Sequence, residues 1–241
     1  LILSLIYGLI IFSLGASWIF NSIYTYGNGG IVISSILTFI FILIQSSYFL
    51  IVGFFVNEKY FDDRNIFFIF VPASFWVLME FTRSNLFTGF PWLIIGHSQI
   101  HTIFDNVFPV VGSFFVSYIV VLISTYLALI FFIKQSFIHN KFAFISLVII
   151  ISLFQFKTDW TEKSSESMSI AVVQPNIKQD DKFNLSNIEI IKEKYASLSN
   201  KLENDLIILP ETALPVVYSE GNQFYRDKII KRADGMISGI F

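Results

Sequence analysis

Residues 107–133 read V-F-P-V-V-G-S-F-F-V-S-Y-I-V-V-L-I-S-T-Y-L-A-L-I-F-F-I and contain no Asp, Glu, Lys or Arg. A helix needs roughly 20 predominantly apolar residues to cross the hydrocarbon core of a bilayer, and this stretch exceeds that length. It therefore predicts a transmembrane helix.

Four further apolar stretches lie in the front part of the chain, at 1–20, 31–56, 66–81 and 142–156. The stretch at 31–56 is also long enough to span, whereas 66–81 and 142–156 are a few residues short of roughly 20. The first stretch starts at Leu1 without the basic residues of a signal peptide, which indicates a chain cut from a longer protein. We expect about five spans in an α-helical transmembrane bundle over residues 1–156.

The composition excludes several classes of protein. Hydrophobic residues make up 54% of the chain and charged residues 14%, against about a quarter in soluble proteins. Disordered chains need low hydrophobicity, and nucleic-acid binders need a basic surface, whereas the net charge here is −2. The absence of cysteine excludes disulfides, Cys-ligated zinc, iron–sulfur clusters and a cysteine nucleophile within these residues.

Charged side chains are concentrated toward the C-terminus. Residues 1–156 hold ten of them and residues 157–241 hold twenty-four. We place a linker at 157–167 and expect a water-soluble domain to start at residue 168 and to be incomplete at residue 241.

The short loops indicate an orientation. Lys59 and Arg64 lie in one loop and Lys134 and Lys141 in another, whereas the loops on the opposite side hold only Arg83. Basic loops stay in the cytoplasm, so residues from 168 onward are expected outside it.

The back part alternates between strand and helix patterns. Apolar runs at 168–174, 205–209 and 235–241 predict strands, and residues 186–200 and 223–232 predict helices, with Ser186 and Glu189 as a capping box. This alternation is typical of the start of an α/β domain.

Glu211 is the first candidate for a catalytic residue, because it directly follows the predicted strand 205–209. Ligands and catalytic groups gather at the carboxyl ends of strands in α/β sheets. A partly desolvated carboxylate there has a raised pKa and can act as a general base; the alternative is an ordinary solvated loop residue.

The second candidate is the loop 82–99, in which Gly89, Pro91 and Gly96 break the helix and Phe90 and Trp92 are aromatic, as expected at a membrane interface. Glu80 and Arg83 lie three residues apart and can pair on one helical face. An acidic residue at the end of an apolar span is a candidate functional residue, although a structural ion pair beside an interfacial loop fits equally well. The residues of this candidate lipid-access site are Glu80, Arg83, Gly89, Phe90, Pro91 and Trp92.

A third group, His97, His101 and Asp105, has the i, i+4, i+8 spacing of metal ligands on one helical face. The region has the composition of a loop, and hydrogen bonding explains these residues better. We expect no metal.

Three segments carry a resemblance to a known family. Residues 75–100 (F-W-V-L-M-E-F-T-R-S-N-L-F-T-G-F-P-W-L-I-I-G-H-S-Q-I) resemble the periplasmic loop of apolipoprotein N-acyltransferases. Residues 170–183 (I-A-V-V-Q-P-N-I-K-Q-D-D-K-F) and 206–215 (L-I-I-L-P-E-T-A-L-P) resemble the opening strand and the first triad segment of their carbon–nitrogen hydrolase domain. Ser17-Trp18 and Tyr26-Gly27 match an early loop. The segments occur in family order and span nearly the whole chain.

The resemblance implies a multi-pass enzyme of the bacterial inner membrane with a periplasmic, nitrilase-like αββα domain. Such an enzyme moves an acyl chain from a phospholipid donor, through a cysteine thioester, to the N-terminal amine of a diacylglyceryl apolipoprotein, with no cofactor. The triad Glu corresponds to Glu211. The triad Lys and Cys are expected outside these residues, so the fragment alone should be inactive.

Two other classes remain open. A membrane-tethered nitrilase-type amidase would use the same triad with water as the acceptor. A non-catalytic membrane protein is the other, although the predicted spans hold almost no charged residues for an ion or proton relay.

Overall fold

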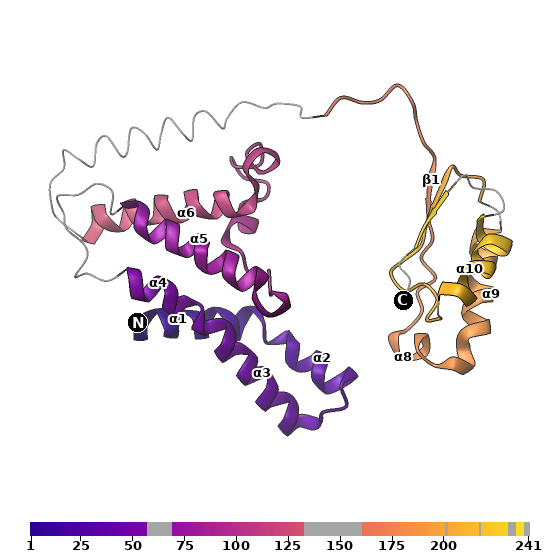
Figure 1. Cartoon of the computed structure of the whole chain (residues 1–241), viewed down its shortest axis with the longest axis horizontal. Helices are drawn as coiled ribbons and strands as arrows, with labels where there is room; N and C mark the ends of the chain where they lie inside the picture. The colour runs from indigo at the N-terminus through magenta and orange to yellow at the C-terminus, as the bar shows by residue number, and fades with distance from the viewer. Residues whose placement is uncertain (57–68, 133–160, 201, 217, 231–234, 239–241) are drawn as a thin grey trace. The chain divides into compact units, whose positions relative to one another are not determined.

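A computed structural model describes residues 1–56, 69–132, 161–200, 202–216, 218–230 and 235–238. The chain divides into two compact units, Leu1–Trp160 and Thr161–Phe241. The first is helical and the second contains a small sheet (Figure 1). Of the predicted linker, residues 161–167 are described and form neither helix nor strand.

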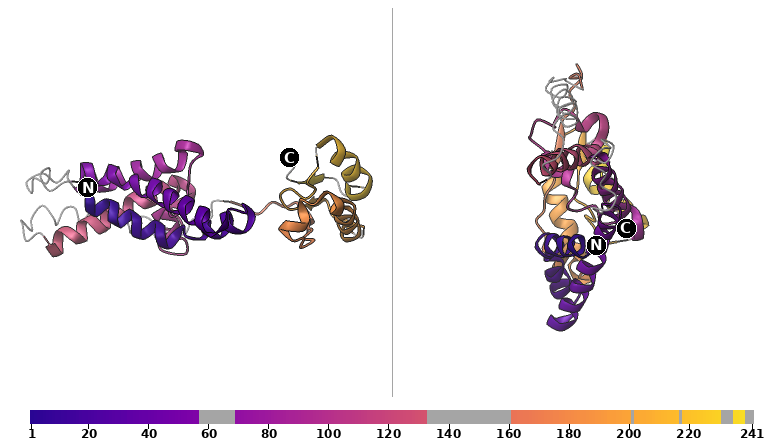
Figure 2. Two further views of the ribbon diagram at one scale, coloured as in Figure 1. Left: turned by 90° about the horizontal axis from the view of Figure 1, so that it is seen from below. Right: turned by 90° about the vertical axis from the view of Figure 1, so that its left-hand side faces the viewer.

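Most of the described residues of the first unit lie in helices. Within it α5 packs against α4 and α6, and α1 packs against α3 and α4 (Figure 1, Figure 2). The elements are α1 (Ile2–Gly15), α2 (Trp18–Tyr26), α3 (Gly30–Ser47), α4 (Phe49–Phe55), α5 (Phe70–Asn85), the 3₁₀ turns η3 (Leu86–Thr88) and η4 (Ile95–Gln99), and α6 (Phe108–Phe132).

Two segments of the described residues are long and apolar enough to cross a membrane, Gly30–Phe55 and Phe108–Ala128. They coincide with the predicted stretches at 31–56 and 107–133. The stretch at 1–20 is broken by a 53° bend between α1 and α2, and the pair counts as a third candidate only if it forms one span. The stretch at 66–81 yields α5, with 16 residues, and the stretch at 142–156 and the two basic loops lie outside the described residues.

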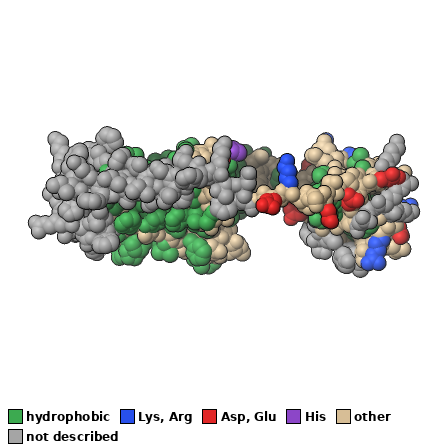
Figure 3. Space-filling view, turned by 90° about the horizontal axis from the view of Figure 1, so that it is seen from above, with side chains coloured by type: hydrophobic (Ala, Val, Ile, Leu, Met, Phe, Trp, Pro, Cys, Tyr) green, Lys and Arg blue, Asp and Glu red, His purple; other side chains and the backbone are tan. Residues whose placement is uncertain are grey.

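Apolar side chains both fill and cover the helical unit. Phe12, Ala16, Ile42, Phe49 and Met79 form a buried cluster between α1, α3, α4 and α5. On the face seen in Figure 3, hydrophobic side chains cover much of the visible part of the described helices, whereas most of the visible acidic and basic side chains lie on the second unit. An apolar outer surface is what a helical unit presents to lipid.

The second unit is built on a three-stranded parallel sheet in the order β1-β2-β3. Its strands are β1 (Ile170–Val172), β2 (Leu206–Ile208) and β3 (Gly235–Ile237), with Ala171 opposite Ile207 and Ile207 opposite Met236. The connecting elements are α8 (Gln179–Lys182), η5 (Leu185–Asn187), α9 (Ile188–Ser199), α10 (Tyr218–Phe224) and the π-turn η6 (Tyr225–Ile229). The predicted strand–helix alternation is confirmed, although each strand is only three residues long.

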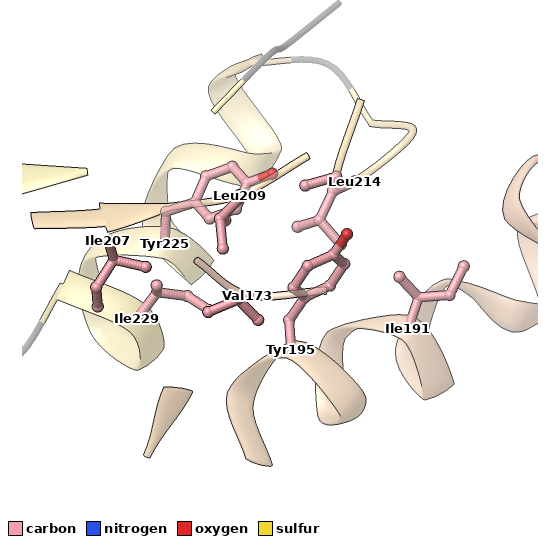
Figure 4. Close-up of a cluster of buried hydrophobic side chains, with 9 residues drawn as sticks. Val173, Ile191, Tyr195, Ile207, Leu209, Leu214, Tyr225 and Ile229 are labelled. Carbon is pink, nitrogen blue, oxygen red and sulfur yellow. The ribbon is translucent and has the colours of Figure 1, made fainter. Parts of the chain in front are cut away.

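The core of this unit lies between the sheet and the helices. Figure 4 shows the ring of Tyr195, from α9, beside Val173 and Leu214. Burial raises the pKa of Tyr195 to about 12. The buried residues are Val173, Ile191, Tyr195, Ile207, Leu209, Ala213, Leu214, Tyr225 and Ile229.

The predicted capping box of Ser186 and Glu189 is wrong. The backbone N–H and the hydroxyl of Ser186 both donate to Asn184 Oδ1, at 3.1 and 2.7 Å, and Ser186 lies within η5. Glu189 instead accepts from Lys192 Nζ at 2.6 Å. The backbone N–H of Ser186, which Glu189 would accept in a capping box, is bound instead by the side chain of Asn184. The α-helix begins two residues later, at Ile188.

Candidate functional site

The connection between α5 and α6 begins with a sharply turned segment. Phe87, Thr88 and Gly89 have φ angles of 52°, 70° and 78°, in the left-handed region that favours glycine. At Gly89 a Cβ atom would lie 1.9 Å from the carbonyl oxygen of Ser84. This close approach of two backbone segments requires glycine, and it folds the aromatic residues back toward the helices.

Glu80 holds the middle of this connection, where η4 begins. Its side chain is 1% exposed, and Oε1 accepts hydrogen bonds from Trp76 Nε1 at 3.0 Å and from the backbone N–H of Ile95 at 2.8 Å. The carboxylate thus fastens the start of η4 to α5. Its other oxygen, Oε2, is buried with no hydrogen-bond partner.

Arg83 holds the near end. It is 2% exposed, and Nη1 donates to the carbonyl oxygens of Phe90, at 2.7 Å, and of Trp92. The backbone N–H of Phe90 donates to the carbonyl oxygen of Arg83 at 2.9 Å. The predicted direct ion pair of Glu80 with Arg83 is not formed, because each charged group reaches into the loop instead of toward the other.

The aromatic residues of the loop differ in exposure, since Phe90 is partly buried and Trp92 is exposed. Phe90 packs edge-on against Phe41 of α3, with ring centroids 4.9 Å apart, and lies 6.4 Å from Phe12 of α1. Trp92 stacks on Phe90 at 5.3 Å and lies 6.2 Å from Trp18. Because Trp92 keeps 52% exposure and Pro91 is also exposed, the rim of the loop is an accessible aromatic surface over a fixed base.

A further contact, not predicted from the sequence, ties the loop to α6. The backbone N–H of Gly96 donates to Ser117 Oγ at 2.8 Å, and a Cβ at this glycine would lie 2.2 Å from the carbonyl oxygen of Ser113. The sequence treats Gly96 only as a helix breaker. The small residues Ser113 and Ser117, one helical turn apart, were the available signal for a close approach.

Glu211 lies in the second unit, in the turn that follows β2. As predicted, it follows the carboxyl end of a parallel strand. Its backbone carbonyl oxygen accepts from Lys182 Nζ at 2.9 Å, and the next residue, Thr212, has a left-handed φ of 51°. The expected partial desolvation is not found, because Glu211 is exposed among the described residues.

The three candidate metal ligands do not assemble. Asp105 accepts from the backbone N–H of His101 at 2.6 Å, and its other oxygen lies 3.7 Å from His101 Nδ1. His97 lies in η4 and is exposed. The described part of the chain contains no group of three or more His, Cys, Asp or Glu that could hold a metal ion.

Comparison with known proteins identifies relatives of this chain. Residues 1–126 match the model of the apolipoprotein N-acyltransferase N-terminal domain. The apolipoprotein N-acyltransferase of Coxiella burnetii is 29% identical over 98% of this chain and 50% of its own length. That of Methylococcus capsulatus is 28% identical over 89% of this chain and 43% of its own length, and that of Wigglesworthia glossinidia brevipalpis is 33% identical over 82% and 40%. The chain spans about half the length of these relatives.

Proposed function

Because the chain belongs to the apolipoprotein N-acyltransferase family, we propose that it serves the transfer of an acyl chain from a phospholipid to the N-terminal amine of a diacylglyceryl apolipoprotein. The relatives' shared name supports this class of reaction. In the proposed first step a cysteine thiolate attacks the ester carbonyl of the donor, and the lysophospholipid alkoxide leaves and takes up a proton. In the second step the amine attacks the thioester, loses a proton, and the thiolate leaves.

These 241 residues contain no cysteine. In this proposal the thiol is therefore supplied from outside them, and the family's order of segments implies the same for the Lys that stabilises the oxyanion. The contribution of the present residues is the membrane part, the start of a nitrilase-like αββα domain, the lipid-access loop and the general base.

The observation that carries the proposal is the loop held by Glu80 and Arg83. A phospholipid donor has to bring its ester group from the bilayer to the reacting atoms, and a fixed aromatic rim is suited to hold its apolar chains. Gly89 permits the turn, Phe90 anchors it, and Pro91 and Trp92 form the exposed rim. We assign to these residues the admission of lipid from the membrane.

Glu211 is proposed as the general base that takes the proton of the thiol and later that of the attacking amine. Two features support this role. It follows a strand of a parallel sheet at its carboxyl end, and Lys182 fixes its backbone while the carboxylate stays accessible. A base must reach its proton directly, and an exposed carboxylate on a fixed turn is able to do so when the reacting groups are brought to it.

The decisive experiment replaces Glu211 by Gln in a preparation that is competent for acyl transfer. Gln keeps the size and loses the basicity, so we expect turnover to fall by about 10²–10⁴, the contribution of a positioned base. Glu193→Gln, an exposed site on α9, is the matched control and should leave the rate unchanged. Formation of the acyl-thioester at the unaltered rate by Glu211→Gln would refute the assignment. Release of free fatty acid in place of N-acylated lipoprotein would show that water is the acceptor and would favour a hydrolase.

The proposed location is the bacterial inner membrane, with residues from 168 onward in the periplasm. The basic loops at 57–65 and 134–141 are the support for this orientation. Reporter enzymes that require the periplasm should be active when fused at about residue 165 and inactive at about residue 138, and the reverse pattern would overturn the orientation.

A further inference from the structure

The turn η3 projects two large apolar side chains away from the helical unit. Phe87 is 84% exposed and Leu86 is about half exposed, although Phe90 and Trp92, a few residues later, pack against one another and the helices. We call Leu86 and Phe87 the apolar tip. The lipid-admitting role proposed for the rim does not use these two residues.

The backbone holds the apolar tip in this outward position. Phe87 and Thr88 both have left-handed φ angles, an unfavourable conformation for residues with a Cβ. Hydrogen bonds on both sides fix the turn: the backbone N–H of Gly89 donates to the carbonyl oxygen of Leu86 at 3.0 Å, and Arg83 binds the following segment. A strained aromatic residue held away from its own protein is a feature that folding alone does not account for.

The surroundings of the apolar tip are uncharged. Residues 84–100 contain no Asp, Glu, Lys or Arg, and Arg83, just before them, is directed inward to carbonyl oxygens. A loop that meets bulk water, or the charged surface of a soluble domain, ordinarily carries such side chains. Seventeen consecutive residues without one fit the boundary between headgroups and hydrocarbon, where aromatic residues are enriched.

The apolar tip also continues a surface that faces outward along α5. Leu78 and Phe81 are exposed on this helix, on the face opposite to Met79, Glu80 and Arg83. Phe81 contacts Phe114 of α6, whose helix is one of the two candidate spans. The one charged residue between these exposed side chains of α5 and the apolar tip is Arg83, which is buried.

We propose that the apolar tip inserts into the lipid surface and fixes the depth at which the α5–α6 connection lies in the bilayer. The occupant of this surface is phospholipid at the headgroup–hydrocarbon boundary. The proposal requires the helical unit to lie in a membrane, and it does not depend on acyl transfer. Anchoring there holds the rim of Pro91 and Trp92 at a constant height relative to the lipids.

The absence of cysteine allows a direct measurement of depth. A nitroxide label is attached to a single introduced cysteine in the full 241-residue chain, in the variants Phe87→Cys, Leu78→Cys and Leu185→Cys. Each labelled variant is reconstituted in vesicles of phosphatidylcholine and phosphatidylglycerol. Leu78 serves as the reference on the apolar face of α5 and Leu185, which is exposed in the second unit, as the reference in water. For each label we compare its collision rate with oxygen, which dissolves in lipid, with its collision rate with a water-soluble nickel complex. We expect the ratio of oxygen to nickel collisions to be several-fold higher for the label at position 87 than for the label at position 185.

Two results overturn the proposal. A label at 87 that is as accessible to nickel as the label at 185 lies in water. A label at 87 that is shielded from both reagents is covered by protein, and the surface is then a docking site for a polypeptide.

A second variant separates anchoring from folding. Phe87→Asn places a residue that tolerates the left-handed region at this position, so the chain should unfold in detergent no earlier than the unaltered one. In vesicles, a nitroxide on Trp92→Cys should then become more accessible to nickel when Phe87→Asn is added, because the loop has lost its anchor. Unchanged nickel accessibility at position 92 would show that Phe87 does not set the depth.

Discussion

The two candidate loops treat their charged side chains in opposite ways. In the helical unit Glu80 and Arg83 are almost fully buried, and each holds backbone groups of the loop. In the α/β unit Glu211 is exposed, and only its backbone carbonyl oxygen is held, by Lys182. The first arrangement uses charge to position a loop, and the second uses a loop to present a charge.

Energetics explain why one chain uses both arrangements. A charge removed from water is costly unless hydrogen bonds replace its hydration, so Glu80 and Arg83 are stable only with the loop in place. An exposed carboxylate incurs no such cost and stays available to a reacting group. The helical loop should therefore be sensitive to the loss of its charges, and the turn at Glu211 should tolerate such a loss in its fold while losing activity.

Arg83→Met should have the largest effect on stability. It removes two charge-assisted hydrogen bonds and leaves the carbonyl oxygens of Phe90 and Trp92 without this donor, so we expect about 3 kcal/mol of destabilisation. Thermal unfolding of the whole chain in detergent micelles, with the transition of each unit followed separately, measures it. Arg226→Met, which removes an exposed guanidinium bonded only to Asn222 Oδ1 among the described residues, is the matched control and should change stability by less than about 0.5 kcal/mol. Equal stability of the two variants would mean that the loop is held by its aromatic packing alone.

Gly96→Ala tests the contact between the loop and α6. The added Cβ would lie 2.2 Å from the carbonyl oxygen of Ser113, so η4 and α6 must separate, at a cost of about 1–3 kcal/mol. Gly221→Ala, in α10, is the control, since its nearest neighbour is a side-chain methyl of Val216 at 3.2 Å and Ala favours a helix. The same unfolding measurement applies to both. If Gly96→Ala unfolds at the same temperature as the unaltered protein, the close approach of Gly96 to Ser113 does not constrain the loop.

Much of the fold was accessible from the sequence because local patterns determine it. Apolar runs located two candidate spans and three strands, and Gly, Pro and aromatic residues identified the loop. The apolar pattern of residues 1–20 did not predict the bend between α1 and α2, and only the resemblance of Ser17-Trp18 to an early loop of the family pointed to a break there.

The site was less predictable, because its contacts join residues far apart in the sequence. Glu80 reaches Ile95, fifteen residues on, and Gly96 reaches Ser117, twenty-one residues on. The spacing of Glu80 and Arg83 placed both on one helical face correctly, but it suggested the wrong partner, since spacing cannot reveal that a folded-back loop offers better acceptors and donors. The exposure of Glu211 likewise depends on which residues cover the end of the sheet, and the apolar pattern of a strand carries no information about them.

The smallest expected effect concerns Asp205, an exposed carboxylate that holds backbone as Glu80 does. Its Oδ2 accepts from the backbone N–H of Ser169 at 2.6 Å and from the Ser169 hydroxyl at 2.9 Å, which joins the residues that precede β1 and β2. These bonds, the backbone one first, lower the pKa of Asp205 below its ordinary value. A carboxyl group with a lowered pKa in the folded state stabilises the fold above its unfolded pKa of about 3.9, and this contribution disappears as the pH falls through the folded pKa.

Urea unfolding of the whole chain, followed by the near-ultraviolet circular dichroism of the buried tyrosines, should therefore show a midpoint that falls between about pH 7 and about pH 3. In Asp205→Asn the fall should be smaller, because an amide keeps an acceptor but does not titrate. In Asp227→Asn, at an exposed position of η6, the midpoint should fall as far as in the unaltered protein. If the midpoints of both variants fall by the same amount, the stabilisation from the bonds to Ser169 does not depend on the charge of Asp205. Charge would then position backbone in this protein only where it is buried, as at Glu80 and Arg83, and the contrast between the two units would become sharper.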